Sequence, residues 1–434
     1  MSTISTSAFR RRLVVALVAV LTLTLGACGG GGDSASGGKT EVVVWDGYTD
    51  APGENFTALI DEYNQQHPDV QVTQLVTDTD HVLQKILTSV RGGTPPDIAY
   101  MYGSWSTNIA KMPKVVDLTE EVKQSGWDWN DFYPALRDSA TVGGKVIGVP
   151  ALVDNLAIVY NKKLFDEAHV APPSPEWTWD DFRSAAAKLT DSSKDQYGFT
   201  MPADTSETVA WHYLPMLWEA GGDVLTPDMT KAAFDSEAGV RSLTTLQQMA
   251  VTDKSVYLDT TNTTAVKLMN SGKIGMLVTG PWDLGSLTDI EYGVQVMPTF
   301  AGSAGTHQTI SGPDNWVMFD NGDARKQASW EFLKWLSSPE IDLKWDILTG
   351  ALPVRAATLK QPDYRQFLDK YPGVGVWADN LKNATQVRPV IASYPKISSA
   401  VGESVVSVLL GKAQPQQALS SASQKTNSIL AVPG

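Results

Sequence analysis

Cysteine, histidine and basic residues are all scarce in this chain of 434 residues, and each shortage excludes a class of function. The single cysteine, Cys28, excludes a disulfide scaffold and any zinc or iron–sulfur site built from several thiolates. Five scattered histidines without an H-x-x-x-H spacing argue against a histidine-rich metal centre. Lysine and arginine number 34 against 48 aspartates and glutamates, so the formal charge is −14 and nucleic acid is a poor partner. We expect neither a metal nor another cofactor.

What the chain does contain is typical of a globular protein of more than one domain. Hydrophobic residues make up 42% and charged residues 19%, which suits neither a disordered chain nor a membrane bundle. The 14 tryptophans outnumber the 11 phenylalanines. Because an indole combines a large flat face with a polar edge, this abundance favours a surface that grips a ligand.

The N-terminus predicts export and lipid attachment. Arg10, Arg11 and Arg12 precede the apolar run 13–27, which at about 15 residues is shorter than the roughly 20 that span a bilayer. We therefore interpret residues 1–27 as a signal peptide. The run ends in L-G-A-C, where Cys28 is either a chance cysteine or the lipidated first residue of the mature chain. We favour lipidation, with palmitate among the acyl groups.

Glycine and serine dominate the residues that follow Cys28, so we expect residues 28–39 to form a flexible tether. Several acyl chains would hold the protein firmly at a membrane. The sequence thus predicts a protein outside the cell membrane, lipid-anchored to its outer face.

Strands and helices alternate from residue 40 onward. Short β-branched runs at 41–45, 70–76 and 98–101 predict strands, and apolar residues at helical spacing predict helices at 56–63 and 81–91. This order implies a parallel sheet of βαβ units. Ligands bind such sheets in the loops at the carboxyl ends of the strands, which here are 46–50, 77–80 and 102–105.

The rest of the chain continues the alternation without a repeat or a long linker. Further strands are predicted at 146–150, 157–160, 272–279 and 294–298. Further helices are predicted after a cap at Thr178, at 211–220 and at 325–336. The fold class is therefore α/β, and two lobes built from interleaved segments fit better than two successive domains.

Several motifs, in this order, resemble one known family. They are V-V-V-W with the helix F-x-x-L-I-D-E-Y-N, G-G-T-P-P-D-I at 92–98, V-I-G-V-P at 146–150, L-A-I-V-Y-N-K-K-L-F at 156–165, W-T-W-D-D-F at 177–182, G-K-I-G-M-L-V-T-G-P-W at 272–282, W-E-F-L-K-W-L-S-S-P-E at 330–340 and T-G-A-L-P-V-R at 349–355. From about residue 40 to the C-terminus the chain resembles extracytoplasmic solute-binding proteins of ABC importers, in the carbohydrate-binding group that includes maltose-binding proteins.

The resemblance implies a fold of two lobes joined by hinge crossovers, with the ligand in the cleft between them. Residues 40–152 and 299–349 would form the N-terminal lobe, and residues 153–298 and 350–434 the C-terminal lobe. A sugar or oligosaccharide would be captured as the lobes close and then delivered to the transmembrane subunits of the permease. We expect a monomer without catalytic residues.

A sugar site needs flat aromatic faces for the C–H surfaces of the rings and polar side chains for the hydroxyls. Trp282 is the main candidate for stacking, since similar sugar binders place a tryptophan there. Asp154 and Asn155 stand where the family often has a hydroxyl-binding acid, although such residues also stabilise turns. Asp80 is a candidate that could instead cap a helix.

Other candidates follow predicted strands or resemble family positions. Tryptophans and tyrosines among them could also pack in the core, and an arginine could also form an ion pair on the rim. These candidates are Asp46, Tyr48, Ser104, Trp105, Trp211, Tyr213, Asp314, Asn315, Trp316 and Arg355, with Trp377 and Arg388 as weaker ones. Seven further tryptophans, Trp345 among them, are predicted to lie in the core.

Two alternatives to sugar capture remain open at this stage. One is a lipid-anchored hydrolase or lyase acting on carbohydrate, although no G-x-S-x-G, P-loop or H-E-x-x-H motif occurs and adjacent acids such as Asp180 and Asp181 point apart on a helix. The other is a binder of a different polar solute, such as a peptide, a polyamine or a phosphodiester.

Overall fold

The computed structural model describes residues 38–77, 79–124, 126–204, 207–302 and 306–432, without the side chains of residues 79–81. The predicted signal peptide and Cys28 lie outside these residues. Lys39 to Gly434 form one compact unit that contains two five-stranded sheets.

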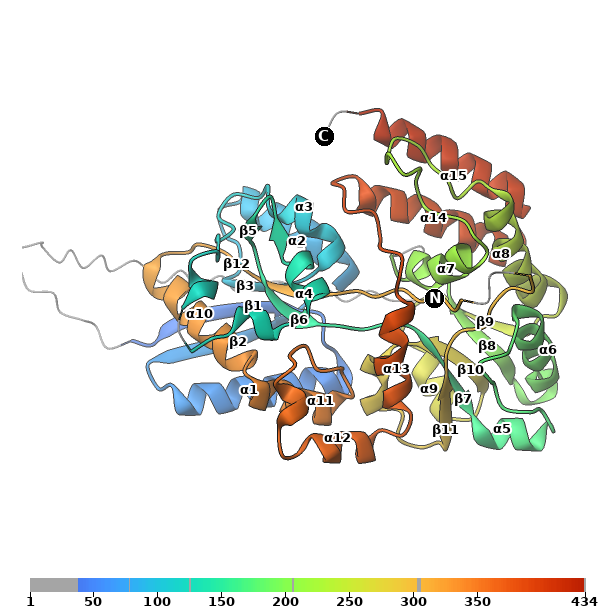
Figure 1. The fold of residues 1–434 in the computed structure, drawn as a ribbon, viewed down its shortest axis with the longest axis horizontal. Coiled ribbons are helices and arrows are strands. Elements are labelled where there is room, and N and C mark those ends of the chain that lie inside the picture. The colour runs from blue at the N-terminus through green and yellow to red at the C-terminus, as the bar shows by residue number, and fades with distance from the viewer. Residues whose placement is uncertain (1–37, 78, 125, 205–206, 303–305, 433–434) are drawn as a thin grey trace, which may run out of the picture. The chain divides into compact units, whose positions relative to one another are not determined.

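The first sheet has the strand order β2-β1-β3-β12-β6 (Figure 1). Its strands are β1 (Thr40–Asp46), β2 (Val70–Val76), β3 (Ile98–Tyr102), β6 (Val149–Leu152) and β12 (Asp314–Met318). β1 pairs in parallel with both β2 and β3, as the βαβ pattern predicts, whereas β12 runs antiparallel to β3 and β6. The distant β12 thus completes a sheet that the N-terminal segment begins.

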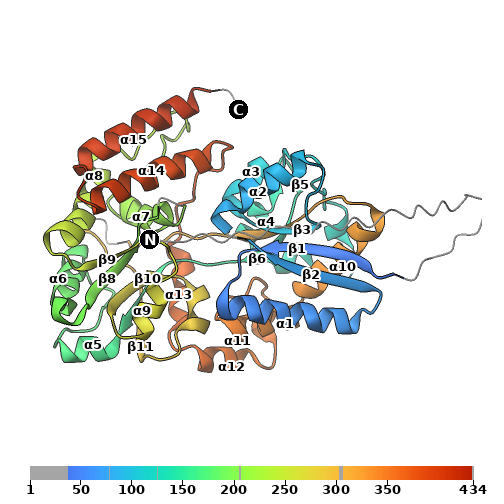
Figure 2. The ribbon, with the colours of Figure 1, turned by 180° about the vertical axis from the view of Figure 1, so that it is seen from behind.

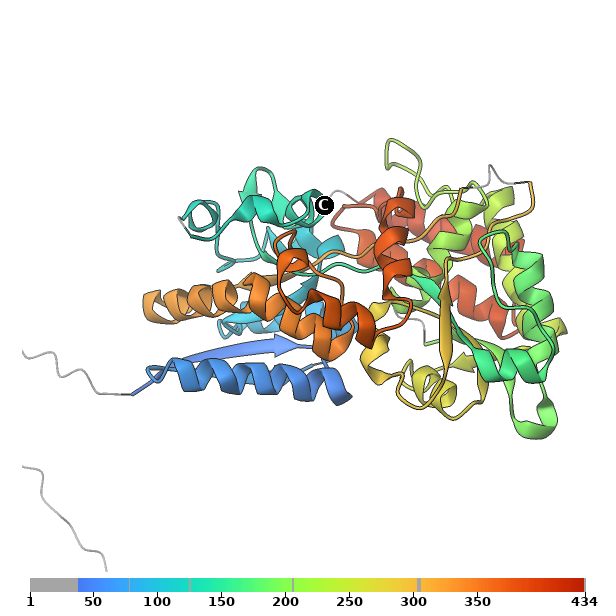
Figure 3. The same cartoon turned by 60° about the horizontal axis from the view of Figure 1, so that its bottom comes forward.

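Helices cover both faces of the first sheet, so its central strands are buried on both sides. Phe56 of α1 (Asp50–Gln66) and Phe332 of α10 (Asp323–Leu336) share one apolar cluster with Val42 and Val44. In Figure 3 the two helices, in blue and orange, run alongside each other. Tyr63 of α1 contacts Phe332 of α10 edge to face. On the other face, α2 (Thr79–Arg91) packs in a separate cluster that includes Ala99 and Met101.

The second sheet has the order β11-β7-β10-β8-β9. Its strands are β7 (Ala157–Asn161), β8 (Tyr197–Pro202), β9 (Val256–Asp259), β10 (Ile274–Thr279) and β11 (Tyr292–Gln295). β10 is parallel to β8, and β8 is parallel to β9, while β7 runs antiparallel to its neighbours. The predicted strand at 294–298 thus begins two residues earlier than expected, and the one at 146–150 is divided between β5 (Lys145–Val146) and β6.

A large apolar cluster joins the second sheet to its helices. α6 (Trp179–Leu189) begins with the predicted cap, where Thr178 and Asp181 form a capping box. Four more helices pack against one another, as Figure 2 shows from behind: α7 (Glu207–Glu219), α8 (Glu237–Gln247), α14 (Tyr394–Leu409) and α15 (Pro415–Leu430). α9 (Ala265–Asn270) and α11 (Pro339–Thr349) lie closer to the site described below. The shorter helices include α4 (Pro134–Ser139), α5 (Lys162–Glu167), α12 (Tyr364–Lys370) and α13 (Val374–Asn380).

Three stretches of chain connect the two sheets. They run from β6 to β7, from β11 to β12, and from α11 toward α13, so each sheet is built from segments that are far apart in sequence. This interleaving agrees with the expectation of two α/β lobes rather than two consecutive domains.

Candidate functional site

A cavity of about 780 Å³ lies between residues of the two sheets. Many of its lining residues stand at the ends of strands or in the loops that follow them, where α/β sheets bind ligands. The residues on which the description depends are Tyr48, Asp50, Tyr100, Asp154, Glu207, Trp211, His212, Asp259, Lys267, Trp282, Asp283, Gly312, Asp314, Trp345 and Arg388.

Two buried carboxyl groups, those of Asp154 and Asp314, form part of this lining. Asp154 Oδ1 accepts a hydrogen bond from the Gly312 amide at 2.9 Å. Asp314 accepts from the Tyr100 hydroxyl at 2.7 Å and from the Gly103 amide at 3.2 Å. Burial raises the pKa of Asp314 to about 7, and burial together with the nearby Asp314 raises the pKa of Asp154 well above its usual value. The pair therefore retains protons that free carboxyl groups would release.

Arg388 lies beside these acids and is itself buried. Its Nη1 donates to Glu207 Oε1 at 2.7 Å, and both side chains of this ion pair are at most 10% exposed. The guanidinium also lies 4.6 Å from the centroid of the Trp211 ring, a cation–π geometry. Arg388 thus connects a C-terminal loop to the first turn of α7 at the cavity.

The stability of the ligand-free protein should depend on pH through Asp314. The groups that act on its carboxyl are Asp154, Glu207, Arg388, Tyr100 and the Gly103 amide. Because the folded-state pKa is raised, the native protein holds a proton that the unfolded chain loses, and the unfolding free energy falls as pH rises from about 4 to about 7. In Asp314→Asn this fall should be smaller, as urea unfolding at several pH values would measure. An equal fall in both proteins would contradict the assigned shift.

Aromatic side chains form the apolar part of the lining. Trp282 is the second residue of the short 3₁₀ segment Pro281–Ser286. It is half-buried and packs on the core of the second sheet while still lining the cavity. From the first sheet, Tyr48 lies 4.9 Å from Trp345 between ring centroids. Trp211 approaches so closely that a Cβ on Gly312 would lie 2.6 Å from its ring. Both halves of the site therefore offer flat apolar surfaces.

Gly280 fixes the position of the Trp282 indole. A Cβ at Gly280 would lie 1.9 Å from Cζ3 of this indole, so only glycine allows the ring to fold back over the backbone. We expect Gly280→Ala to displace the ring and change the intrinsic fluorescence of the protein. Gly375→Ala, at a position where a Cβ meets nothing within 4 Å, is the matched control. Unchanged fluorescence in Gly280→Ala would argue against this packing.

Some lining groups were not among the residues predicted from the sequence. Asp259 ends β9 and accepts from the amides of Thr261, Thr264 and Ala265, and Asp283 accepts from the Thr279 hydroxyl at 2.5 Å. Burial raises the pKa of Asp283 to about 6. Asp259 could have been found by applying the strand-end rule to the second sheet, and Asp283 directly follows Trp282.

Five of the predicted ligand-binding residues line the cavity. They are Tyr48, Asp154, Trp211, Trp282 and Asp314. Asp80 lies in α2, and its side chain falls outside the described part of the structure. The remaining eight are absent from the described lining.

Three of these eight residues lie next to residues that do line the cavity. Asp46 is fully buried and accepts from the Tyr48 amide at 2.9 Å and from Gln74 at 3.0 Å. Asn155 donates to the Trp377 carbonyl and accepts from Asn380, each at 2.8 Å. Asn315 points away from Asp314 because successive residues of a strand face opposite sides, and it donates to Ser139 at 3.3 Å.

The other aromatic and polar candidates are buried in the protein core. Ser104 and Trp105 are 6% and 2% exposed, in the turn after β3. Tyr213 is fully buried, with its hydroxyl 3.0 Å from Ser242 Oγ. Trp316 stacks on Phe56 at 5.4 Å between centroids. The weaker candidate Trp377 is also fully buried, whereas Arg388 lines the cavity.

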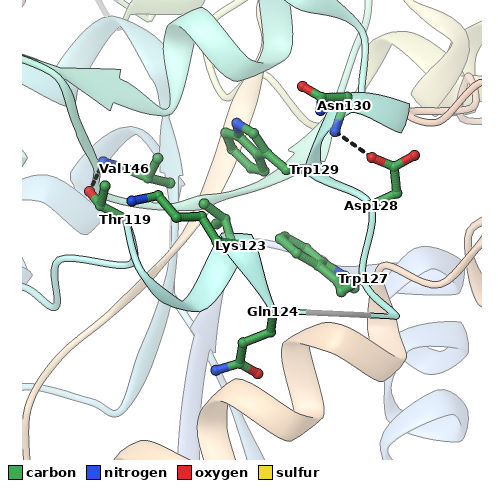
Figure 4. A pocket seen from close by; sticks show the side chains of 9 residues that line it. Thr119, Lys123, Gln124, Trp127, Asp128, Trp129, Asn130 and Val146 are labelled. Atoms are coloured by element: carbon green, nitrogen blue, oxygen red, sulfur yellow. Dashed lines mark hydrogen bonds between the residues drawn. The ribbon is translucent and has the colours of Figure 1, made fainter.

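A second pocket, of about 500 Å³, is lined by residues between Thr119 and Val146 (Figure 4). Arg355 contacts two of these lining residues, Trp127 and Asp128. Its guanidinium stands 4.2 Å from the Phe132 ring centroid and 5.3 Å from that of Trp127, and it donates to the Asp128 carbonyl at 3.1 Å. In Figure 4 Trp127 and Trp129 both face this pocket. The arginine thus packs on aromatic rings instead of reaching the larger cavity.

The described residues contain no group of three or more His, Cys, Asp or Glu side chains arranged to hold a metal ion. Within the same part of the chain, no helix has the length and apolar character that crossing a membrane requires.

Comparisons with known proteins agree on one family. Residues 46–342 match the family described as bacterial extracellular solute-binding protein. The sn-glycerol-3-phosphate-binding periplasmic protein UgpB of Pectobacterium atrosepticum is 25% identical over 408 residues, covering 90% of this chain and 91% of the relative.

Solved structures share the whole two-lobed fold. The cyclic α-maltosyl-1,6-maltose binding protein from Arthrobacter globiformis is 27% identical, with a TM-score of 0.71 over 91% of this chain and 99% of that one. An ABC transporter solute-binding protein from Thermotoga lettingae, bound with α-D-tagatose, is 24% identical, with a TM-score of 0.80 over 91% of this chain and 100% of that one.

Proposed function

We propose that this chain, which belongs to the bacterial extracellular solute-binding protein family, captures a sugar or oligosaccharide in its cavity and delivers it to the permease of an ABC importer. The observation that carries the choice of solute is the lining itself. It joins half-buried indole and phenol rings to buried carboxyl groups, the combination that the two kinds of surface on a sugar require. Relatives named for maltose-type sugars and structures holding tagatose support the same class.

In this proposal the rings of the sugar stack on Trp282 and on the aromatic pair of Tyr48 and Trp345. Hydroxyl groups donate to Asp154 and Asp314, whose buried positions make these hydrogen bonds strong. Residues 40–152 with 299–349 form one lobe, and residues 153–298 with 350–434 form the other. The three connecting stretches act as hinges, and the lobes close over the solute without changing it chemically.

A screen for thermal stabilisation tests the proposal. The purified protein is heated alone and with maltose, maltotriose, tagatose, ribitol or glucosamine. A solute at 100 times its dissociation constant should raise the unfolding free energy by about 2.7 kcal/mol and the Tm accordingly. Chromatography of the same mixtures should recover the solute unchanged. Turnover would instead support the carbohydrate-active enzyme, and no stabilisation by any of these compounds would contradict sugar capture.

For the localisation of the protein, we propose that the signal peptide, residues 1–27, is removed and that Cys28 is lipidated. Residues 28–39 then tether a monomer to the outer face of the cell membrane. In Cys28→Ser the protein should leave the membrane fraction and appear in the soluble extracytoplasmic fraction, as immunoblotting of fractionated cells would detect. Retention of the variant in the membrane would contradict anchoring through this cysteine.

A further inference from the structure

We propose that the cavity takes an uncharged or positively charged solute, and that its own carboxylates exclude solutes bearing a phosphate group. The inference rests on the proposed function and narrows its substrate class. A phosphate-bearing solute is a relevant comparison, because the Pectobacterium relative is named for binding sn-glycerol 3-phosphate.

Carboxyl groups far outnumber cationic side chains in the described lining of the cavity. Only two cationic side chains are found in the described lining, those of Lys267 and Arg388. Lys267 is exposed on α9, and Arg388 is buried in its ion pair with Glu207. Seven carboxyl groups share the same lining, those of Asp50, Asp154, Asp204, Glu207, Asp259, Asp283 and Asp314.

Helix N-termini, which commonly bind phosphate through free backbone amides, are occupied by acids here. At α9, Asp259 accepts from the amides of Thr264 and Ala265 at 2.7 and 3.1 Å. α1, α7 and the 3₁₀ segment at Trp282 carry Asp50, Glu207 and Asp283 in their first turns. At α9 the amides are thus taken by Asp259, and at the other three termini a first-turn acid places its charge near the amides.

Three further polar groups of the lining are engaged within the protein. The Tyr100 hydroxyl and the Gly312 amide donate to Asp314 and Asp154. His212 has Nδ1 at 2.8 Å from the Thr208 carbonyl and Nε2 at 3.1 Å from the Val278 carbonyl, so neither ring nitrogen faces a solute. The lone pairs of the carboxyl oxygens can accept from hydroxyl or ammonium donors, whereas an ionised phosphate oxygen has no hydrogen to donate to them.

Charge repulsion determines how strongly the cavity disfavours a phosphate-bearing solute. The region around Asp154 and Asp314 disfavours negative charge, since burial raises the pKa of both carboxyl groups and the nearby Asp314 raises that of Asp154 further. A phosphate would add one or two more negative charges to a lining in which carboxyl groups outnumber cations seven to two, and in which Arg388 is already paired with Glu207. Like charges juxtaposed at a binding site weaken binding by large factors, and an ammonium group at this place is attracted instead.

The test compares neutral, cationic and phosphorylated solutes by thermal shift and calorimetry at one salt concentration. The first two groups are the sugars of the screen above together with glucosamine, and the third group is sn-glycerol 3-phosphate and glucose 6-phosphate. We expect stabilisation by at least one compound of the first two groups, and binding of the phosphates at least about 100-fold weaker. Comparable binding of either phosphate would overturn the inference while leaving solute capture intact. Stabilisation by none of the compounds would contradict the proposed function itself.

Charge-neutral variants locate the excluding groups. In Asp314→Asn, and in Asp283→Asn should the first fail to fold, the preference for the neutral sugar over its phosphate should fall by about tenfold or more. Asp166→Asn, which removes an exposed charge from α5 outside the lining, is the matched control and should leave the preference unchanged. An unchanged preference in both cavity variants would overturn the role given to these carboxylates.

Discussion

Replacing Arg388 with methionine should lower the free energy of unfolding by about 3–5 kcal/mol, the cost typical of breaking a buried ion pair from one side. The substitution leaves the Glu207 carboxylate buried without its cation, and it removes the charge that lies over the Trp211 ring. Urea unfolding followed by tryptophan fluorescence and by circular dichroism measures the change, provided that the two signals give the same transition.

Two further variants make this result specific. The double variant Arg388→Met, Glu207→Gln also removes the negative charge of the Glu207 carboxylate. Part of the lost unfolding free energy should therefore return. Arg365→Met breaks an ion pair whose two side chains are 79% and 61% exposed, and it should have little effect on the unfolding free energy. A loss in Arg388→Met no larger than in Arg365→Met would contradict the structural role of the buried pair.

Replacing Trp282 with alanine should weaken binding of the sugar by about 10- to 100-fold, or roughly 1–3 kcal/mol. The reason is that the variant removes a large flat face from the cavity and leaves the hydrogen-bonding acids in place. Isothermal titration calorimetry with the sugar that stabilises the parent protein measures the effect.

Trp129 provides the matched control for this variant because it lines the second pocket (Figure 4). Trp129→Ala should bind the sugar as the parent protein does. Full affinity in Trp282→Ala would contradict the proposal that the sugar stacks on this indole. Lost affinity in Trp129→Ala would show that the second pocket takes part in binding.

Much of the fold could be predicted from local patterns. The β-branched run at 70–76 coincides with β2, and the three N-terminal strands pair in parallel as the alternation of strands and helices predicts. The capping box at Thr178 was equally readable, since both of its partners lie within one turn. The division of the strand predicted at 146–150 could not be read, because it depends on pairing with the distant β12.

The site was harder to predict than the fold because lining a cavity depends on contacts between distant segments. The strand-end position predicts Tyr48, which lines the cavity, and it equally predicts Ser104 and Trp105, which are absent from the described lining. After β3 the chain instead turns inward, where the Gly103 amide donates to the Pro313 carbonyl at 3.1 Å. The sequence predicts Trp345 in the core, and in the structure it packs against the core from α11 while also lining the cavity beside Tyr48.

Residues from the C-terminal region gave the weakest signal. Nothing in the sequence around Arg388 indicates that it meets Glu207, which lies 181 positions earlier. Arg355 was favoured over it because the segment T-G-A-L-P-V-R matches a family pattern. Packing on Phe132 and Trp127 holds Arg355 away from the cavity, a contact that involves a distant part of the chain.

A crystal structure of the protein with its stabilising sugar bound tests the central claim most directly. We predict electron density in the larger cavity, with a ring against Trp282 and hydroxyl groups within hydrogen-bonding distance of Asp154 or Asp314. Density instead between Trp127 and Trp129, with the larger cavity holding only water, would contradict the assignment of the solute site.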